Sequence, residues 1–274
     1  FRFPLEDAGE ILTDLQQRMQ DDFPPLSGLT DMTVSCAIKT VSESLQSYTS
    51  PAFYLTPPLD NLTENVIYIN PASTGTGLEL YTTLAHEGYP GHLYQTVYSR
   101  LYENSVTDNP VRGVLSFNGF VEGWAYYVEN ISYGYAADVL LENGGSEADQ
   151  VLVQLLCLER NLQINLYCLL DLSIHYYGAD REDVFRSLAA FGISDTATAG
   201  AIYDYIRREP ATYLKYYLSY LEILSLKEEA QELWQEQYSD LRFHTFLLQT
   251  GPSDFTNLEK RLREQNPGVQ QPKV

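Results

Sequence analysis

The chain has 274 residues, of which 44% are hydrophobic, and its 17 basic and 37 acidic residues give a formal net charge of −20. This length and composition predict one folded unit spanning residues 1–274. The negative charge argues against a nucleic-acid partner, because a phosphate backbone would be repelled, and it disfavours anionic membranes. No run of about 20 uncharged apolar residues occurs, so we expect no membrane-spanning segment.

Structured sequence is already present at the start of the chain. Residues 5–19 have the apolar spacing of an amphipathic helix, which Pro24 and Pro25 terminate. The first residue is Phe1 rather than a methionine. We therefore expect the chain to be the C-terminal part of a longer protein whose N-terminal region packs against it. At the other end, the polar residues 266–274 are expected to fray.

Three short runs rich in β-branched and aromatic residues predict strands at 33–38, 52–55 and 65–70. An edge strand can receive an extended peptide through backbone hydrogen bonds. Residues 66–70 come directly before the histidine-containing segment, so we expect them to form this edge. Asn70 is accordingly a candidate substrate-binding residue.

Helices are predicted along the rest of the chain by apolar residues at three- and four-residue spacing. Combined with the strands, they indicate an α+β fold that is mainly α-helical, with a small sheet beside the helix that carries the histidines. The predicted helices cover residues 78–102, 113–135, 147–177, 181–191, 195–207, 210–237 and 240–248.

Two of the four histidines flank a glutamate in the segment AHEGYPGHLYQ, residues 85–95, and Glu122 follows. A zinc ion that hydrolyses peptides needs three nitrogen and oxygen ligands, an open position for water and a carboxylate that accepts the proton of that water. His86, His92 and Glu122 are the candidate ligands, and Glu87 is the candidate base. We expect one Zn²⁺ per chain.

The spacing of the two histidines excludes a regular helix between them. In the familiar H-E-x-x-H motif the histidines are four residues apart and share one helical face. His86 and His92 are six apart, so at roughly 100° per residue they would differ by about 240°. Pro90 and Gly91 could supply a bulge or kink that returns His92 to the face of His86.

The segments HEGYPGH (residues 86–92) and EGWAYYVE (residues 122–129) resemble the bacterial DUF885 family. Similarity continues through residues 171–175, 210–217 and 243–251, so the resemblance covers most of the chain. The family is grouped with gluzincin-type metallopeptidases. The resemblance implies a gluzincin-like fold, with the sheet beside the metal-binding helix, and metal-dependent hydrolysis, but it implies no substrate.

Several further side chains could support a metal site from outside the coordination sphere. Glu129 lies seven residues after Glu122, near the same helical face, and could orient His86 or His92; the alternative is a solvated surface carboxylate. Asp171 and His175 are four apart and could form a local pair, support the site or donate to an oxyanion, and His244 has the same range of roles. For each single histidine the alternative is a buried core residue.

A tyrosine hydroxyl could stabilise the oxyanion that forms during hydrolysis. Tyr213, Tyr216 and Tyr220 share a helical face. Tyr216 is the candidate because it matches the tyrosine that follows the proline in the family pattern, although a core or rim position is the alternative. Ser219 stands where the resemblance implies a glycine, which puts close helix packing there in doubt.

Two adjacent arginines precede Pro210 in the sequence. Arg207 and Arg208 could hold the C-terminal carboxylate of a substrate, which would indicate a carboxypeptidase or dipeptidase. The alternative is that they compensate the dipole at the C-terminus of a helix.

These residues predict a zinc-dependent metallopeptidase that cleaves peptide substrates with metal-activated water and a glutamate base. One alternative is a non-catalytic peptide-binding scaffold of the bacterial envelope, and another is a zinc hydrolase of a non-peptide amide or ester. A tyrosine-rich, acidic and cysteine-poor composition favours the bacterial cell envelope or exterior over the cytoplasm.

Overall fold

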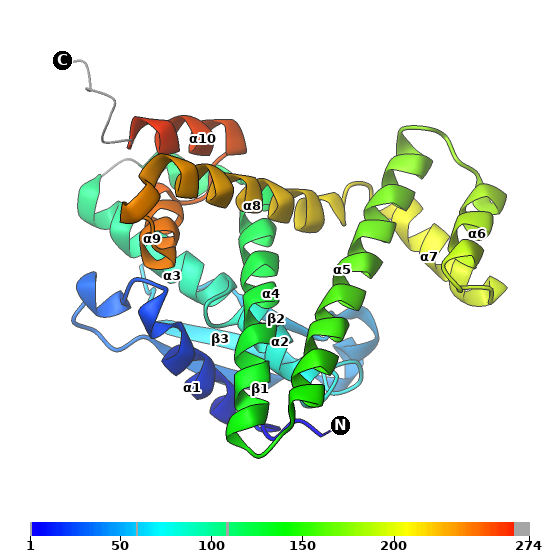
Figure 1. Cartoon of the computed structure of the whole chain (residues 1–274), viewed down its shortest axis with the longest axis horizontal. Coiled ribbons are helices and arrows are strands. Elements are labelled where there is room, and N and C mark those ends of the chain that lie inside the picture. Colours follow the sequence, from blue (N-terminus) through cyan, green and yellow to red (C-terminus); the bar gives the residue numbers. More distant parts are fainter. Residues whose placement is uncertain (1, 59, 108–109, 266–274) are drawn as a thin grey trace.

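Helices make up most of the molecule, and a small sheet lies against them on one side (Figure 1). The computed structural model describes residues 2–58, 60–107 and 110–265, so the predicted frayed tail 266–274 lies outside the described residues. The mainly helical α+β fold predicted from the sequence is confirmed. The α-helices are α1 (Ala8–Arg18), α2 (Leu78–Glu87), α3 (His92–Val106), α4 (Asn118–Glu142), α5 (Glu147–His175), α6 (Arg181–Ala190), α7 (Thr196–Arg208), α8 (Leu214–Trp234), α9 (Asp240–Thr250) and α10 (Phe255–Glu264).

Several helices begin where a short polar side chain accepts hydrogen bonds from backbone N–H groups of the first turn. Such a cap contributes about 1 kcal/mol because it satisfies donors that have no partner within the helix. One of them starts α10, a helix that the sequence analysis did not predict. The capping residues are Asp7, Asp180, Asp195, Ser239 and Asp254.

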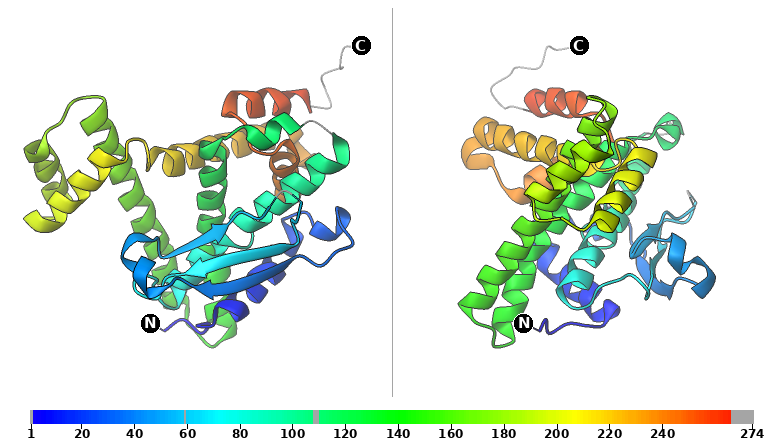
Figure 2. Two further views of the ribbon diagram at one scale, coloured as in Figure 1. Left: turned by 180° about the vertical axis from the view of Figure 1, so that it is seen from behind. Right: turned by 90° about the vertical axis from the view of Figure 1, so that its right-hand side faces the viewer.

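The sheet has three strands, β1 (Ser35–Thr40), β2 (Ala52–Leu55) and β3 (Glu64–Ile69), in the order β1-β3-β2. β3 pairs in parallel with β1 and antiparallel with β2. The prediction that residues 66–70 form an edge is therefore wrong, because β3, the strand closest in sequence to the histidines, has a neighbour on each side. The edges belong to β1 and β2, and β2 is the strand that packs on α2. Seen from behind in Figure 2, the sheet lies in front of the lower part of α4, and α2 packs against both β2 and α4.

The helix predicted at residues 78–102 is interrupted. α2 ends at Glu87 and α3 begins at His92, and Gly88 to Gly91 connect them without helical geometry. The interruption is more complete than the predicted bulge or kink, because the two histidines lie on two separate helices.

α4 runs through the centre of the main core and places Trp124 and Tyr126 among fully buried side chains. It crosses α8 at Gly123, where an added Cβ would lie 2.6 Å from the Cβ of Ser219. Ser219 thus permits close packing, and the glycine that this approach requires is on α4. Within the described ranges, no helix is both long and apolar enough to cross a membrane.

A second, smaller core joins the C-terminal half of α5 to α6 and α7, at one end of the molecule (Figure 1). Along α5, five aliphatic side chains at spacings of four, three, four and seven residues are more than half exposed, although this spacing is typical of a buried helical face. We call this surface the α5 apolar face. It consists of Val151, Leu155, Leu158, Leu162 and Leu169.

His244 is a core residue, which does not match the predicted support or oxyanion role. Its Nδ1 lies 2.6 Å from the carbonyl of Asp22 and its Nε2 lies 2.9 Å from the hydroxyl of Tyr127. Because a carbonyl only accepts, Nδ1 carries the proton and Nε2 accepts from Tyr127. The ring stacks on Phe23 with centroids 4.1 Å apart. Burial lowers the pKa of His244 to about 4.

This burial predicts a pH-dependent contribution to stability. The folded protein holds His244 neutral, whereas the unfolded chain takes up a proton near the ordinary pKa of 6.5. The contribution is therefore present above that pKa and is lost as the pH falls toward 4. Between pH 7 and pH 5, the native protein should lose about 2 kcal/mol more free energy of unfolding than His244→Gln. Urea unfolding at both pH values measures the difference, and equal losses would contradict it.

Candidate metal centre

Three chain segments bring the predicted ligands together. His86 lies in the last turn of α2, His92 is the first residue of α3, and Glu122 comes from the first turns of α4. The imidazole centroids are 4.8 Å apart with the rings nearly perpendicular. Glu122 Oε2 lies 3.7 Å from His86 Nε2 and 3.4 Å from His92 Nε2. The three side chains therefore converge on one point and could hold a metal ion.

The turn between α2 and α3 explains how histidines six residues apart can converge. At Gly91 the chain folds back onto the end of α2, so that an added Cβ would lie 1.8 Å from the carbonyl oxygen of His86. Only glycine permits this approach. The indole Nε1 of Trp124 donates to the carbonyl of Pro90 at 2.9 Å, which ties the turn to α4.

The donor set fits a zinc ion. Zinc binds nitrogen and carboxylate oxygen at about 2.0–2.2 Å, and tetrahedral angles then separate the ligand atoms by about 3.3–3.6 Å. The two distances from Glu122 Oε2 to the imidazoles are close to this separation. The same oxygen is buried and lacks a hydrogen-bond partner among the described residues. A buried carboxylate oxygen without a donor is costly, and a bound cation would satisfy it.

Negative charge dominates around the two histidines. Burial lowers the pKa of His86, but the nearby carboxylates of Glu122 and Glu129 outweigh burial and raise this pKa to about 10. Burial raises the pKa of Glu122, but its contacts with His86 and His92 outweigh that effect and hold its pKa well below the usual range. The surroundings of His86 therefore favour a positive charge at this point.

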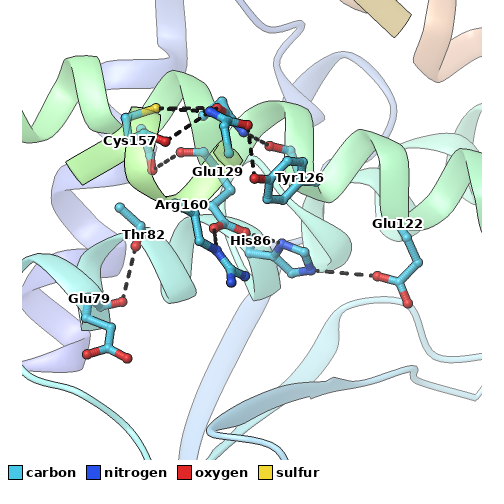
Figure 3. Close-up of polar contacts among 11 residues, drawn as sticks. Glu79, Thr82, His86, Glu122, Tyr126, Glu129, Cys157 and Arg160 are labelled. Carbon is cyan, nitrogen blue, oxygen red and sulfur yellow. Dashed lines mark hydrogen bonds and ion pairs between the residues drawn. The ribbon is translucent and has the colours of Figure 1, made fainter. Parts of the chain in front are cut away.

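Glu129 lies directly behind His86, as the sequence spacing suggested (Figure 3). Its Oε2 accepts from His86 Nδ1 at 2.9 Å, which leaves Nε2 facing Glu122. Arg160 of α5 donates from Nε to the other oxygen of Glu129 at 3.2 Å. Arg160 was not among the site residues predicted from the sequence. The available signal was a charged residue inside the long apolar run of α5.

Glu87 points toward the sheet rather than into solvent. The backbone N–H of Tyr54 in β2 donates to Glu87 Oε2 at 2.8 Å. Since β2 is an edge strand, this N–H belongs to the side of the strand that faces away from β3. The edge beside the candidate base is therefore β2, and one of its backbone donors already holds Glu87.

α8 brings a phenol and an ammonium group to the same place. The ring of Tyr216 lies 6.1 Å from the ring of His86. Burial, followed by the charges of Glu122 and Glu87, raises the pKa of Tyr216, so its hydroxyl remains protonated at neutral pH. Lys215 Nζ lies 3.5 Å from Glu122 Oε1. Lys215 was not predicted as a site residue, because only the packing of α8 on α4 reveals its proximity.

Three other candidates have structural contacts elsewhere. Asn70 is fully buried, and its amide nitrogen donates to two carbonyls of the loop before β2, so it is not available to a substrate. Asp171 accepts from the backbone N–H of Ala211 at 3.2 Å. His175 donates from Nε2 to the carbonyl of Ile206 at 2.9 Å. Asp171 and His175 connect α5 to the end of α7 and the start of the next segment.

The two adjacent arginines lie in the last turn of α7. Arg208 donates from Nε to the carbonyl of Asp204 at 3.0 Å and lines a surface hollow that also contains the Asp204 carboxylate. This placement favours the alternative of dipole compensation at a helix C-terminus. In the part of the chain that the structure describes, neither arginine has a direct contact with the candidate ligands.

Two solved structures, each described as a "putative lipoprotein", have a similar fold. The one from Colwellia psychrerythraea has a TM-score of 0.73 and 22% identity, and the match covers 94% of this chain and 42% of that chain. The one from Shewanella oneidensis, whose function is given as unknown, has a TM-score of 0.71 and 18% identity over 96% of this chain and 47% of that chain. This chain thus spans less than half the length of either protein.

No protein in the curated set matches the chain significantly. A family model does match, over residues 4–262, and so includes every candidate ligand and the residues that contact them. The chain belongs to the DUF885 family, bacterial proteins of unknown function.

Proposed function

We propose that this chain is the catalytic region of a zinc-dependent metallopeptidase. The observation that carries the proposal is the convergence of His86, His92 and Glu122 on one point, with Glu87 beside them. Two imidazoles and one carboxylate form the ligand set of many peptidase zinc sites, in which the fourth position is open to water. Calcium and magnesium prefer oxygen ligands, so the two imidazoles favour zinc.

When bound, zinc lowers the pKa of a water molecule toward neutrality and polarises a substrate carbonyl. Proton transfer then falls to Glu87. Its Oε2 is held by the N–H of Tyr54, which leaves Oε1 to accept the proton of the attacking water and later deliver it to the departing amine. The hydrogen bond from β2 fixes the orientation of the carboxylate before substrate arrives.

Tyr216 is proposed as the donor to the oxyanion. Its phenol lies beside His86, and the effects that raise its pKa keep the proton on the hydroxyl. A neutral donor aimed at a developing negative charge stabilises the transition state more than the ground state. Glu129 is proposed to position His86, because its hydrogen bond to Nδ1 fixes the ring and the tautomer.

The first prediction from this proposal concerns metal content. Elemental analysis of the purified chain should find about one zinc per chain, and His92→Ala and Glu122→Ala should remove it because each deletes a ligand. Glu129→Gln should retain the site but weaken zinc affinity about 10- to 100-fold. Gly91→Ala should also lose zinc, because the added Cβ collides with the carbonyl of His86.

Gly134→Ala is the matched control for the glycine variant. Gly134 lies within α4, and an added Cβ there meets no atom within 4 Å, so this variant should bind zinc like the native chain. If the native chain takes up no zinc even after reconstitution, the metallopeptidase proposal fails and a non-catalytic scaffold takes its place.

The second prediction concerns the base. Glu87→Gln should keep the zinc and lower the rate of peptide hydrolysis by about 10²- to 10⁴-fold, because the amide cannot accept the proton. Hydrolysis can be measured with a library of quenched fluorescent peptides. Glu79→Gln on the exposed side of α2 is the matched control and should leave the rate unchanged. Zinc-loaded native chain that cleaves esters but none of the peptides would instead indicate a hydrolase of non-peptide bonds.

We further propose that the α5 apolar face is covered by a preceding region of a longer protein. Contiguous exposed apolar surface is rare on a soluble monomer, and five aliphatic residues of this face are more than half exposed. The two similar structures extend well beyond the part that matches this chain. A longer protein of that kind has enough additional chain to cover the face.

A dye that fluoresces on apolar surfaces tests this proposal. The isolated chain should bind the dye, and replacing Leu155, Leu158 and Leu162 together by serine should remove most of the binding, because these side chains are the most exposed of the face. The full-length protein should bind little dye. Equal dye binding by the isolated chain and the full-length protein would contradict the proposed cover.

A further inference from the structure

A cavity of about 290 Å³ is lined by residues of α3 and α4 that lie about one helical turn from His92 and Glu122. α3 and the start of α4 form two of its walls, and the segment after α9 closes a third. Its size suits one amino-acid residue with its terminal group. We call it the α3 cavity. Its lining includes Thr56, Thr96, Arg100, Glu103, Arg112 and Asn118.

The cavity continues the metal centre along the same helical faces. Thr96 and Glu103 follow His92 by four and eleven residues on α3, so all three lie on one side of that helix. On α4, Asn118 precedes Glu122 by four residues, which is about one turn. The lining of the α3 cavity therefore begins about one helical turn away from two of the candidate ligands.

The edge strand leads to the same cavity. Tyr54 of β2 contacts Glu87 through its backbone N–H, and Thr56 two residues later lines the cavity. Backbone groups two residues apart on an extended strand face the same side. The path from the candidate base along the outer edge of β2 therefore leads to Thr56, the first residue after the strand, which lines the α3 cavity.

The cavity is positively charged in a strongly negative protein. Two arginines and one glutamate line it, whereas the whole chain carries a net charge of −20. Arg112 is already engaged, because its guanidinium donates to the carbonyls of Thr250 and Pro252 and its Nε lies 3.6 Å from Glu103. Among the described residues, Arg100 is the cavity arginine that makes neither a hydrogen bond nor an ion pair to another side chain.

We propose that Arg100 binds a carboxylate of the substrate in the α3 cavity. A guanidinium pairs with a carboxylate through two parallel hydrogen bonds, and this pairing is strongest where water is partly excluded. The peptide substrates would then be those with a carboxylate close to the cleaved bond, either the C-terminus or an acidic side chain. Hydrolysis of such peptides rests on the proposed function, but the binding step does not.

Binding of three probes to the Glu87→Gln chain, both with zinc and without added metal, tests this assignment, because this variant is designed to block turnover and the preference due to Arg100 should not require the metal. The probes are dansylated trialanine with a free C-terminus, its C-terminal amide, and the amide with a central glutamate. Fluorescence titration gives the dissociation constants. The free acid should bind about 10- to 100-fold more tightly than the amide, as expected for a hydrogen-bonded charge pair. Recovery of tight binding by the glutamate amide would assign the pocket to an acidic side chain.

Arg100→Gln should abolish the preference for the carboxylate, and Arg100→Lys should retain part of it, because the charge remains without the two parallel hydrogen bonds. Arg208→Gln should retain the full preference. The assignment is overturned if the chain with Arg100 and Arg208 intact shows no preference for the carboxylate. It is also overturned if Arg100→Gln keeps this preference or if Arg208→Gln loses it. Circular dichroism and thermal unfolding verify that each variant is folded, and the lysine variant tests the pairing if the glutamine variant is not.

The outcome is separable from that of the proposed function. Arg100-dependent carboxylate binding without any peptide hydrolysis by the chain with Glu87 intact would reject the peptidase and leave the cavity assignment in place. Hydrolysis that depends on Glu87 but not on a substrate carboxylate or on Arg100 would support the peptidase and reject the cavity assignment.

Discussion

The backbone between α2 and α3 turns back on itself, and the geometry of the candidate metal centre depends on that turn. Gly91 packs against the carbonyl of His86 so closely that no side chain fits there. The hydrogen bond from Trp124 to Pro90 holds the same turn against α4. Since Trp124 is two residues from Glu122 on α4, this contact also fixes the position of Glu122 along the axis of α4 relative to His92. The turn at Gly91 and the indole of Trp124 therefore position three candidate ligands from three helices relative to one another.

One buried carboxylate (Glu129) and two half-buried ones surround the two histidines, and each has a partner from a different element. Arg160 of α5 holds Glu129, Lys215 of α8 lies beside Glu122, and the N–H of Tyr54 in β2 holds Glu87. Buried charge is costly without such compensation. The centre therefore requires α5 and α8 to be packed on α4 and the sheet to be packed on α2. A divalent cation between the histidines would supply the remaining positive charge.

Sequence patterns predicted what local residue types encode. The ligand cluster follows from histidines and glutamates in two short motifs, and the helical interval between Glu122 and Glu129 predicted the support of His86. The prediction that residues 66–70 form an edge strand was wrong, because proximity in sequence to the histidines does not decide which strand is central. Arg160 and Lys215 reach the site through tertiary contacts that no sequence spacing reveals, and the place of Arg100 in the α3 cavity likewise depends on how the helices pack. Arg207 and Arg208 were substrate-binding candidates because they are adjacent, but their place at the C-terminus of α7 accounts for both positive charges.

The edge of β2 restricts how a peptide could lie in the proposed site. Glu87 already occupies the outward N–H of Tyr54, so a bound peptide cannot pair continuously along this strand without displacing the base. Thr56, the first residue after β2, lines the α3 cavity, so a peptide that leaves the bond between Tyr54 and Glu87 intact could be held in that cavity rather than along the strand. If the proposed roles of Glu87 and Arg100 are both correct, the site favours peptides with a carboxylate close to the cleaved bond, which a C-terminus supplies at the end of a peptide and an acidic side chain supplies within it.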